Sequence, residues 1–205
     1  EAKPFSSAEF IKKASGIKAR YAYIKDGILD IDRMRPKIPE RKEGELSHQA
    51  EIALNAARIA LKEANKPASE IDAVIVSCAY TERYYPAIAI EVQNELAITG
   101  FGFDMLVACS AATFALQRAY EMVSSGTAKC VLIVNPELTS PQVNYHDRDS
   151  HFIFGDVSTA TVVESTDTCK SEHSYEILGT KAITLYSNNI RSNFGYITNS
   201  TDADP

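Results

Sequence analysis

The chain has 205 residues, of which 45% are hydrophobic and 23% charged, a composition typical of a globular protein with its own core. Its formal net charge of −6 argues against non-specific nucleic-acid binding. No apolar run approaches the roughly 20 residues that span a bilayer, so no membrane partner is expected. The four cysteines form no CxxC pair, which argues against a metal site and predicts reduced thiols in a cytoplasmic protein.

The first predicted elements are a surface excursion, a helix and a strand. Residues 26–44 are polar and rich in Arg, Lys and Pro, which predicts an excursion over the surface rather than a linker between domains. Ser47 can cap a helix that runs to about residue 65 and has an alanine-rich apolar face. Residues 72–78 form a continuous apolar run, which is typical of a strand buried on both faces.

Helices and strands continue to alternate in the middle of the chain. Pro86 can open a helix at 87–96. A strand at 103–107 then leads directly into a helix at 110–124, which Gly126 is well placed to cap. This order of elements predicts a layered α/β sheet.

Three later segments also predict strands. They are the apolar run at 130–134 and the segments 159–164 and 175–186. Beyond residue 187 polar residues dominate, and no periodic pattern is present.

Cys109 lies at the junction between the predicted strand at 103–107 and the helix that follows it. The unpaired N–H groups and partial positive charge of a helix start favour the thiolate, which is the nucleophilic form. The arrangement corresponds to a nucleophile elbow with Cys in place of Ser and without the flanking glycines. A buried, inert thiol is the alternative that the local sequence leaves open. Cys78 and Cys130 are predicted to lie in the core, and Cys169 has no evident role.

Other polar residues have both a functional and a structural interpretation. Either His146 or His151 could pair with Cys109 in a Cys–His hydrolase, although a surface or structural role is favoured for both. Glu82 follows the first strand at the edge of an α/β sheet that commonly binds ligands, but most single loop charges are merely solvated. Glu137 follows the strand at 130–134 and is predicted to anchor backbone N–H groups.

Three segments in a fixed order carry a resemblance to a known family. They are Ser15-Gly16-Ile17-Lys18-Ala19-Arg20, the Cys109 turn, and Asp147-Arg148-Asp149 followed by Phe154-Gly155-Asp156. The set resembles the N-terminal half of β-ketoacyl-acyl-carrier-protein synthase III and its thiolase-fold relatives over about residues 5–164. The resemblance implies a layered α-β-α-β-α fold. This chain would be one N-terminal half-domain, residues 1–205, with a mixed five-stranded sheet and helices on both faces.

The resemblance also implies acyl-thioester chemistry in fatty-acid biosynthesis or related lipid metabolism. Cys109 would accept an acyl group from an acyl-CoA or an acyl-acyl-carrier protein, and malonyl-acyl-carrier protein would then condense with it. The backbone N–H of Cys109 would form part of an oxyanion hole. The substrates would be thioesters of CoA or of carrier phosphopantetheine, with no permanently bound cofactor. A homodimer is implied.

Two residues align with the family's CoA site. Phe10 aligns with an aromatic residue, commonly Trp, that packs on the CoA adenine, and Arg148 aligns with a residue near the CoA nucleotide. The segment at Gly155 is predicted to be a backbone turn near the active site rather than a phosphate cradle.

The chain also departs from the family pattern. Ala111 stands where the family usually has Gly, and Val157-Ser158 replaces Gly-Ala. Together with the 26–44 insertion, these changes predict a divergent branch that takes longer acyl groups or a carrier-bound primer. The family's catalytic His and Asn lie in a C-terminal half that this chain lacks. The tail at 187–205 is therefore expected to lead to that missing half, and the chain alone is expected to be inactive in condensation.

Two alternatives from other functional classes remain open at this point. One is a non-catalytic partner subunit that keeps the fold for dimerisation, against which the presence of Cys109 argues. The other is a thioester hydrolase or acyltransferase that stops at the acyl-cysteine. Malonyl-dependent carbon–carbon bond formation would separate a synthase from both.

Overall fold

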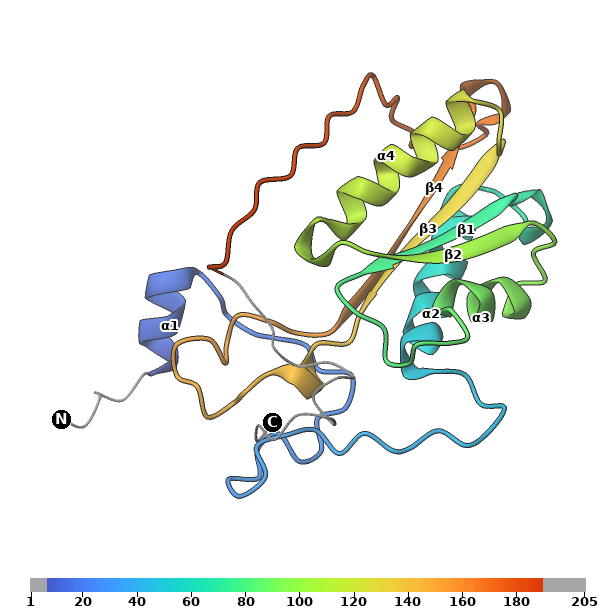
Figure 1. The fold of residues 1–205 in the computed structure, drawn as a ribbon. Coiled ribbons are helices and arrows are strands. Elements are labelled where there is room, and N and C mark those ends of the chain that lie inside the picture. Colours follow the sequence, from blue (N-terminus) through green and yellow to red (C-terminus); the bar gives the residue numbers. More distant parts are fainter. Residues whose placement is uncertain (1–6, 190–205) are drawn as a thin grey trace.

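A four-stranded mixed sheet forms the centre of this computed structural model, which describes residues 7–189 (Figure 1). The strands are β1 (Ala73–Cys78), β2 (Phe101–Leu106), β3 (Cys130–Glu137) and β4 (Val157–Glu164). Their order is β2-β1-β3-β4, with β1 parallel to both of its neighbours and β4 antiparallel to β3. The predicted layered α/β sheet is confirmed, with four strands in place of the five expected.

Helices cover both faces of the sheet, and short 3₁₀ turns link several elements. The helices are α1 (Ala8–Ser15), α2 (His48–Glu63), α3 (Ile88–Glu95) and α4 (Ala111–Ser124). The 3₁₀ turns are η1 (Ala68–Glu70), η2 (Ala108–Ser110), η3 (Ser140–Gln142) and η4 (Thr166–Thr168). Figure 1 shows α4 on one face of the sheet, α2 and α3 on the other, and α1 away from the sheet. None of the described helices is long and apolar enough to cross a membrane.

The central strand β1 is buried on both of its faces, as its continuous apolar run predicts. Side chains alternate between the faces of a strand, so Val74 and Val76 pack in the cluster under α2 and α3. Ala73 and Ile75 pack in the second cluster, under α4. The core therefore consists of two apolar layers separated by one sheet.

Local signals set the ends of the helices. The Ser47 hydroxyl oxygen accepts a hydrogen bond from the Ala50 N–H at 3.0 Å and so caps α2. Gly126 has φ 76° just after α4, where a left-handed residue ends the helix. The helix after Pro86 starts later than predicted, because Ala87 is its N-cap and Ile88 its first residue.

The predicted strand at 175–186 is wrong, because these residues have no strand conformation. In Figure 1 the segment runs away from the sheet beside α4. Tyr175 is 96% exposed and Tyr186 92% exposed. A strand needs a neighbour for its backbone N–H and C=O groups, and within residues 7–189 this segment has none. Residues 190–205, most of the expected tail, lie outside the described residues.

The excursion at 26–44 contains no helix or strand and is mostly exposed. Two backbone hydrogen bonds close its neck: Lys37 N–H donates to the Asp26 carbonyl at 2.8 Å, and Arg35 N–H to the Gly27 carbonyl at 3.2 Å. Gly27 has φ 86°, and a Cβ atom there would lie 2.6 Å from the Arg35 carbonyl oxygen. The neck therefore requires glycine at this position.

Candidate active site

Cys109 lies in η2, the short turn between β2 and α4, and its side chain is exposed. The turn reverses the chain tightly: Ser110 N–H donates to the Val107 carbonyl at 3.1 Å. Ala108 has φ 45°, in the left-handed region that residues with a Cβ rarely occupy. In the part of the chain that the structure describes, this thiol is therefore not buried, and the turn presents the sulfur at the surface.

The start of α4 lies directly beside this turn. Ala111 is the first residue of the helix, and the side chain of its N-cap, Ser110, makes no capping hydrogen bond. The first N–H groups of a helix have no partners within the helix and carry a partial positive charge. The backbone around Cys109 can therefore donate to a negatively charged oxygen formed next to the sulfur.

A buried serine lies beneath the same turn. Ser77, on β1, is fully buried, and its hydroxyl oxygen lies 2.9 Å from the Ala111 carbonyl oxygen and 3.1 Å from the Met105 carbonyl oxygen. The two carbonyls flank the Cys109 turn on its helix side and its strand side. Ser77 could not be identified from the sequence, because a lone serine in an apolar strand has no pattern that marks it.

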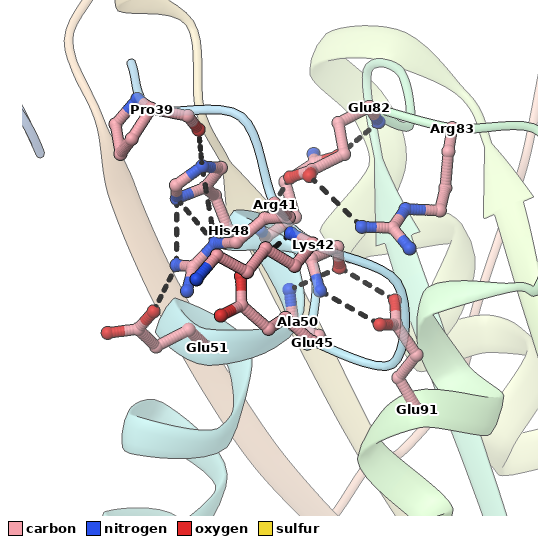
Figure 2. A network of polar contacts seen from close by, with 12 residues as sticks. Pro39, Arg41, Lys42, Glu45, His48, Ala50, Glu51, Glu82, Arg83 and Glu91 are labelled. Atoms are coloured by element: carbon pink, nitrogen blue, oxygen red, sulfur yellow. Dashed lines mark hydrogen bonds and ion pairs between the residues drawn. The ribbon is translucent and has the colours of Figure 1, made fainter.

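Glu82 anchors the loop after β1 to the start of α2 (Figure 2). Its carboxylate accepts a hydrogen bond from the Gln49 N–H at 2.9 Å, and the Gln49 side-chain carbonyl accepts one from the Glu82 N–H at 2.6 Å. The Gln49 amide also donates to the carbonyls of Tyr80 and Pro136, at 2.9 and 3.2 Å. Glu82 is therefore engaged in fixing the loop, which favours the structural interpretation.

A second carboxylate binds at the same helix end. Glu91, on α3, accepts hydrogen bonds from the Ser47 N–H at 2.8 Å and from the Ser47 hydroxyl at 2.7 Å. Figure 2 shows Glu91 directed from α3 towards the start of α2. Negative charge is favourable at a helix N-terminus, so Glu82 and Glu91 fix α2, α3 and the loop after β1 relative to one another.

A cluster around Arg41 joins the end of the 26–44 excursion to α2 (Figure 2). The Arg41 guanidinium pairs with Glu51, donates to His48 Nδ1 at 2.8 Å and to the Tyr23 hydroxyl at 3.3 Å. His48 Nε2 lies 2.8 Å from the Pro39 carbonyl oxygen, which makes Nε2 the donor nitrogen of the ring. The hydrogen bond from Arg41 lowers the pKa of Glu51. The cluster borders a hollow of about 590 Å³.

The carboxylates of two further acidic residues accept hydrogen bonds from backbone N–H groups. Glu137 accepts a hydrogen bond from the Ala79 N–H at 2.9 Å, as predicted, and burial raises its pKa. Asp156 accepts from the Ser140 N–H at 2.7 Å and from the Tyr23 N–H at 2.8 Å. The Asp156 N–H also donates to the Tyr21 carbonyl at 2.8 Å, so this segment is attached to residues 21–23, and the structure shows no turn at Gly155-Asp156 where one was predicted.

The two histidine candidates make local contacts. The His151 Nδ1 lies 3.0 Å from the Asp147 carbonyl oxygen, and its ring meets Phe152 edge-on at 5.4 Å. The His146 N–H donates to the Asn144 side chain at 3.1 Å. Within residues 7–189 no group of three or more His, Cys, Asp or Glu side chains could hold a metal ion.

The two predicted CoA residues lie on neighbouring segments. Phe10 is 63% exposed on α1, a helix with no buried residue. Arg148 is half-buried in the loop between β3 and β4. The segment after α1 contacts that loop, because the Arg20 Nε donates to the Ile153 carbonyl at 2.8 Å. Their binding roles stay predictions.

Known proteins resemble this chain in sequence and in fold. Residues 103–184, which include the Cys109 turn and α4, match the family model described as 3-oxoacyl-[acyl-carrier-protein (ACP)] synthase III. Over 197 residues the chain is 51% identical to a β-ketodecanoyl-[acyl-carrier-protein] synthase of Pseudomonas aeruginosa, covering 96% of this chain and 56% of that protein.

Solved structures show the same fold. The 3-oxoacyl-[acyl-carrier-protein] synthase III of Aquifex aeolicus superposes with a TM-score of 0.64 at 31% identity, over 79% of this chain and 46% of that one. A priming β-ketosynthase of a polyketide biosynthetic pathway gives a TM-score of 0.66 at 28% identity, over 80% of this chain and 43% of that one. The chain thus spans about half the length of the relatives that it matches.

Proposed function

Since this chain belongs to the 3-oxoacyl-[acyl-carrier-protein] synthase III family, we propose that it supplies the nucleophile of a condensing acyltransferase. The observation that carries the proposal is the exposed Cys109 on a strained turn at the start of α4. The enzyme would form a 3-oxoacyl thioester from an acyl thioester and malonyl-acyl-carrier protein, without a permanently bound cofactor.

The reaction proceeds in two steps through Cys109. In the first, the thiolate sulfur attacks the thioester carbonyl, and the carrier thiol leaves as an acyl-cysteine forms. In the second, the malonyl group loses CO₂, and the resulting carbanion attacks the acyl carbonyl and forms a carbon–carbon bond. The Cys109 thiolate then leaves. In both steps the backbone N–H groups around Cys109 would stabilise the oxyanion of the tetrahedral intermediate.

The complete reaction is proposed to require residues beyond this chain. The family resemblance places a catalytic His and Asn in the second half of the fold, and this chain covers 56% of its Pseudomonas relative. We therefore propose that the active enzyme contains a C-terminal half, which protonates the leaving thiol and stabilises the carbanion. The described residues alone would accept an acyl group slowly and would not condense it.

The acyl donor is proposed to be longer than acetyl. The name of the Pseudomonas relative describes a ten-carbon 3-oxoacyl product, and condensation with malonyl adds two carbons, so its donor would have eight. We transfer this preference to the present enzyme on the basis of the 51% identity. Steady-state rates across acyl-CoA chain lengths test it, and a clear preference for acetyl-CoA would overturn it.

Phe10 and Arg148 are proposed to bind the CoA donor. An exposed aromatic ring on α1 can stack on the adenine, and a guanidinium can bind the nucleotide phosphates. Phe10→Ala should raise the KM for acyl-CoA several-fold and leave the KM for an acyl-carrier protein unchanged. Equal effects on both donors would contradict the assignment.

A homodimer is proposed to form at the edge strand β2. Among residues 7–189 this strand pairs only with β1, and its Phe101 and Leu106 are 43% and 55% exposed. An exposed edge with apolar side chains is a template for pairing with a second copy. Sedimentation of the full-length protein should give a dimer that Phe101→Asp weakens. A monomeric parent protein would refute the proposal.

The central experiment is acyl transfer to the full-length protein. Incubation with radiolabelled acyl-CoA or acyl-acyl-carrier protein, followed by peptide mapping, should place the label on Cys109. Addition of malonyl-acyl-carrier protein should then move the label into a 3-oxoacyl product. Absence of label would favour the non-catalytic subunit. Label that is hydrolysed or transferred without carbon–carbon bond formation would favour the hydrolase or acyltransferase.

A further inference from the structure

Three polar side chains form a row across the sheet on the face that α4 covers. Ser77 is on β1, Asn135 on β3 and Thr159 on β4. Asn135 on β3 is the register partner of Thr159 on β4. Ser77 and Asn135 come directly after Val76 and Val134, which are register partners on β1 and β3. Two residues earlier on β1 and β3, the same face carries Ile75 and Ile133, both in the apolar core. The polar row therefore lies at the level of the Cys109 turn, immediately beyond the apolar layer.

Hydrogen bonds connect the row from β4 to the turn. The Thr159 hydroxyl donates to the Asn135 side-chain carbonyl at 3.4 Å, and the Asn135 amide donates to the Ser77 carbonyl at 2.7 Å. The Ser77 hydroxyl in turn reaches the carbonyls of Ala111 and Met105, at 2.9 and 3.1 Å. The chain of contacts thus crosses β4, β3 and β1 and ends on both sides of Cys109.

The position of Ser77 constrains the turn that carries the nucleophile. A hydroxyl has one proton, so Ser77 donates to either carbonyl or is shared between the two. Either way it joins the end of β2 to the first residue of α4. Between them lies Ala108 with its positive φ, and a conformation of that kind persists only when its surroundings enforce it.

We propose that Ser77 is a positioning residue for Cys109, holding the strained turn so that the sulfur faces the thioester and the oxyanion donors. This inference rests on the proposed function, in which Cys109 is acylated. Asn135 supports Ser77 from the neighbouring strand by fixing its backbone. Neither residue contacts the reacting atoms, so their effect is on the rate of acyl transfer rather than on substrate binding.

The test measures single-turnover acylation of Cys109 in the full-length enzyme. Ser77→Ala should lower the acylation rate constant about tenfold, with the half-saturating donor concentration unchanged. Ser77→Thr, which keeps the hydroxyl, should recover most of the rate. Ser158→Ala is the matched control, because Ser158 has a buried hydroxyl oxygen with no hydrogen-bond partner among the described residues. Its acylation rate should equal that of the parent enzyme.

Alkylation of the buried cysteines shows whether Ser77→Ala slows acylation by misplacing Cys109 or by destabilising the whole fold. Cys78 and Cys130 are buried, so they should stay unmodified by iodoacetamide in Ser77→Ala as long as the core is intact. If Ser77→Ala does not fold, Asn135→Ala takes its place, with an expected decrease in rate of about threefold.

The outcomes distinguish this inference from the proposed function. If the parent enzyme acquires label on Cys109 and Ser77→Ala acquires it equally fast, the positioning role is refuted and the proposed function stands. An equal loss of rate in Ser158→Ala would also refute it. If the parent enzyme acquires no label on Cys109, the proposed function fails, and the role of Ser77 fails with it.

Discussion

Glu82 and Gln49 bind each other's backbone reciprocally: each side chain accepts a hydrogen bond from the other residue's N–H, at 2.9 and 2.6 Å. The pair joins the loop after β1 to the first turn of α2. A carboxylate at this helix end also complements the partial positive charge of the helix. Glu82 therefore contributes to the stability of the loop that borders the carboxyl end of the central strand.

Replacing Glu82 should weaken this attachment. We expect Glu82→Ala to lower the free energy of unfolding by about 1–2 kcal/mol, because the Gln49 N–H loses its acceptor. Glu82→Gln keeps an acceptor oxygen and should cost less. Urea denaturation measures both, with the exposed Glu95→Ala as control. Unchanged stability together with lost activity in Glu82→Ala would assign the residue to the chemistry instead.

The cysteines should differ sharply in reactivity. Cys109 is exposed, whereas burial raises the pKa of Cys78 and of Cys130 to about 12. Iodoacetamide at neutral pH should therefore alkylate Cys109 in the native protein and reach the two buried thiols only after denaturation. Mass spectrometry of tryptic peptides over time measures the order. Early modification of Cys78 would contradict the burial described for β1.

Lys66 should be important for stability. It is 6% exposed, and its Nζ lies 2.7 Å from Glu164 and 3.1 Å from Glu70. Lys66→Met would leave the nearly buried Glu164 without its cation, at an expected cost of about 3–5 kcal/mol. Lys170→Met removes only an exposed partner of Glu70, so it should cost less than about 0.5 kcal/mol. Equal losses in the two variants would contradict this assignment.

The same ion pair predicts a pH dependence. Burial alone would lower the pKa of Lys66, but the hydrogen bonds and charges of Glu164 and Glu70 outweigh it and raise the pKa above its usual 10.5. The contribution to stability is then complete below pH 10.5 and lost as the pH rises through the folded-state pKa. Unfolding free energies between about pH 8 and 12 should show this alkaline loss in the parent protein and a smaller one in Lys66→Met.

Gly155 should tolerate no side chain. A Cβ atom there would lie 2.9 Å from the Tyr21 carbonyl oxygen and 3.2 Å from Arg20 Cδ. Gly155→Ala should therefore push the segment at Gly155 away from residues 20–21 and lower the free energy of unfolding by about 1–3 kcal/mol. At Gly179 a Cβ atom would meet nothing within 4 Å, so Gly179→Ala provides the control in the same thermal or urea denaturation experiment.

Much of the fold could be predicted because its signals are local. The Ser47 cap, the alanine-rich face of α2 and the apolar run of β1 each depend on residues close in sequence. Gly126 marks the end of α4 for the same reason. Cys109 was located by the change from strand to helix around it, which is also a local signal.

The rest depends on partners that are distant in sequence. The segment at 175–186 has a strand-like pattern, but a strand forms only where a neighbour is available. Ser77 contacts Ala111, which lies 34 residues later, and Asn135, which lies 58 residues later. Glu82 meets Gln49 from 33 residues away. No periodicity in the sequence reveals such pairs. The polar row and the carboxylates that bind the start of α2 could therefore be identified only from the structure.

The closed neck of the 26–44 excursion has an evolutionary consequence. The bonds from Lys37 to Asp26 and from Arg35 to Gly27 join the two sides of the loop, and the Arg41 cluster fastens its far end to α2. The tip at residues 28–34, which this neck encloses, can thus gain, lose or exchange residues while the rest of the fold keeps its shape. Changes confined to this tip should therefore leave the sheet and the turn that carries Cys109 undisturbed.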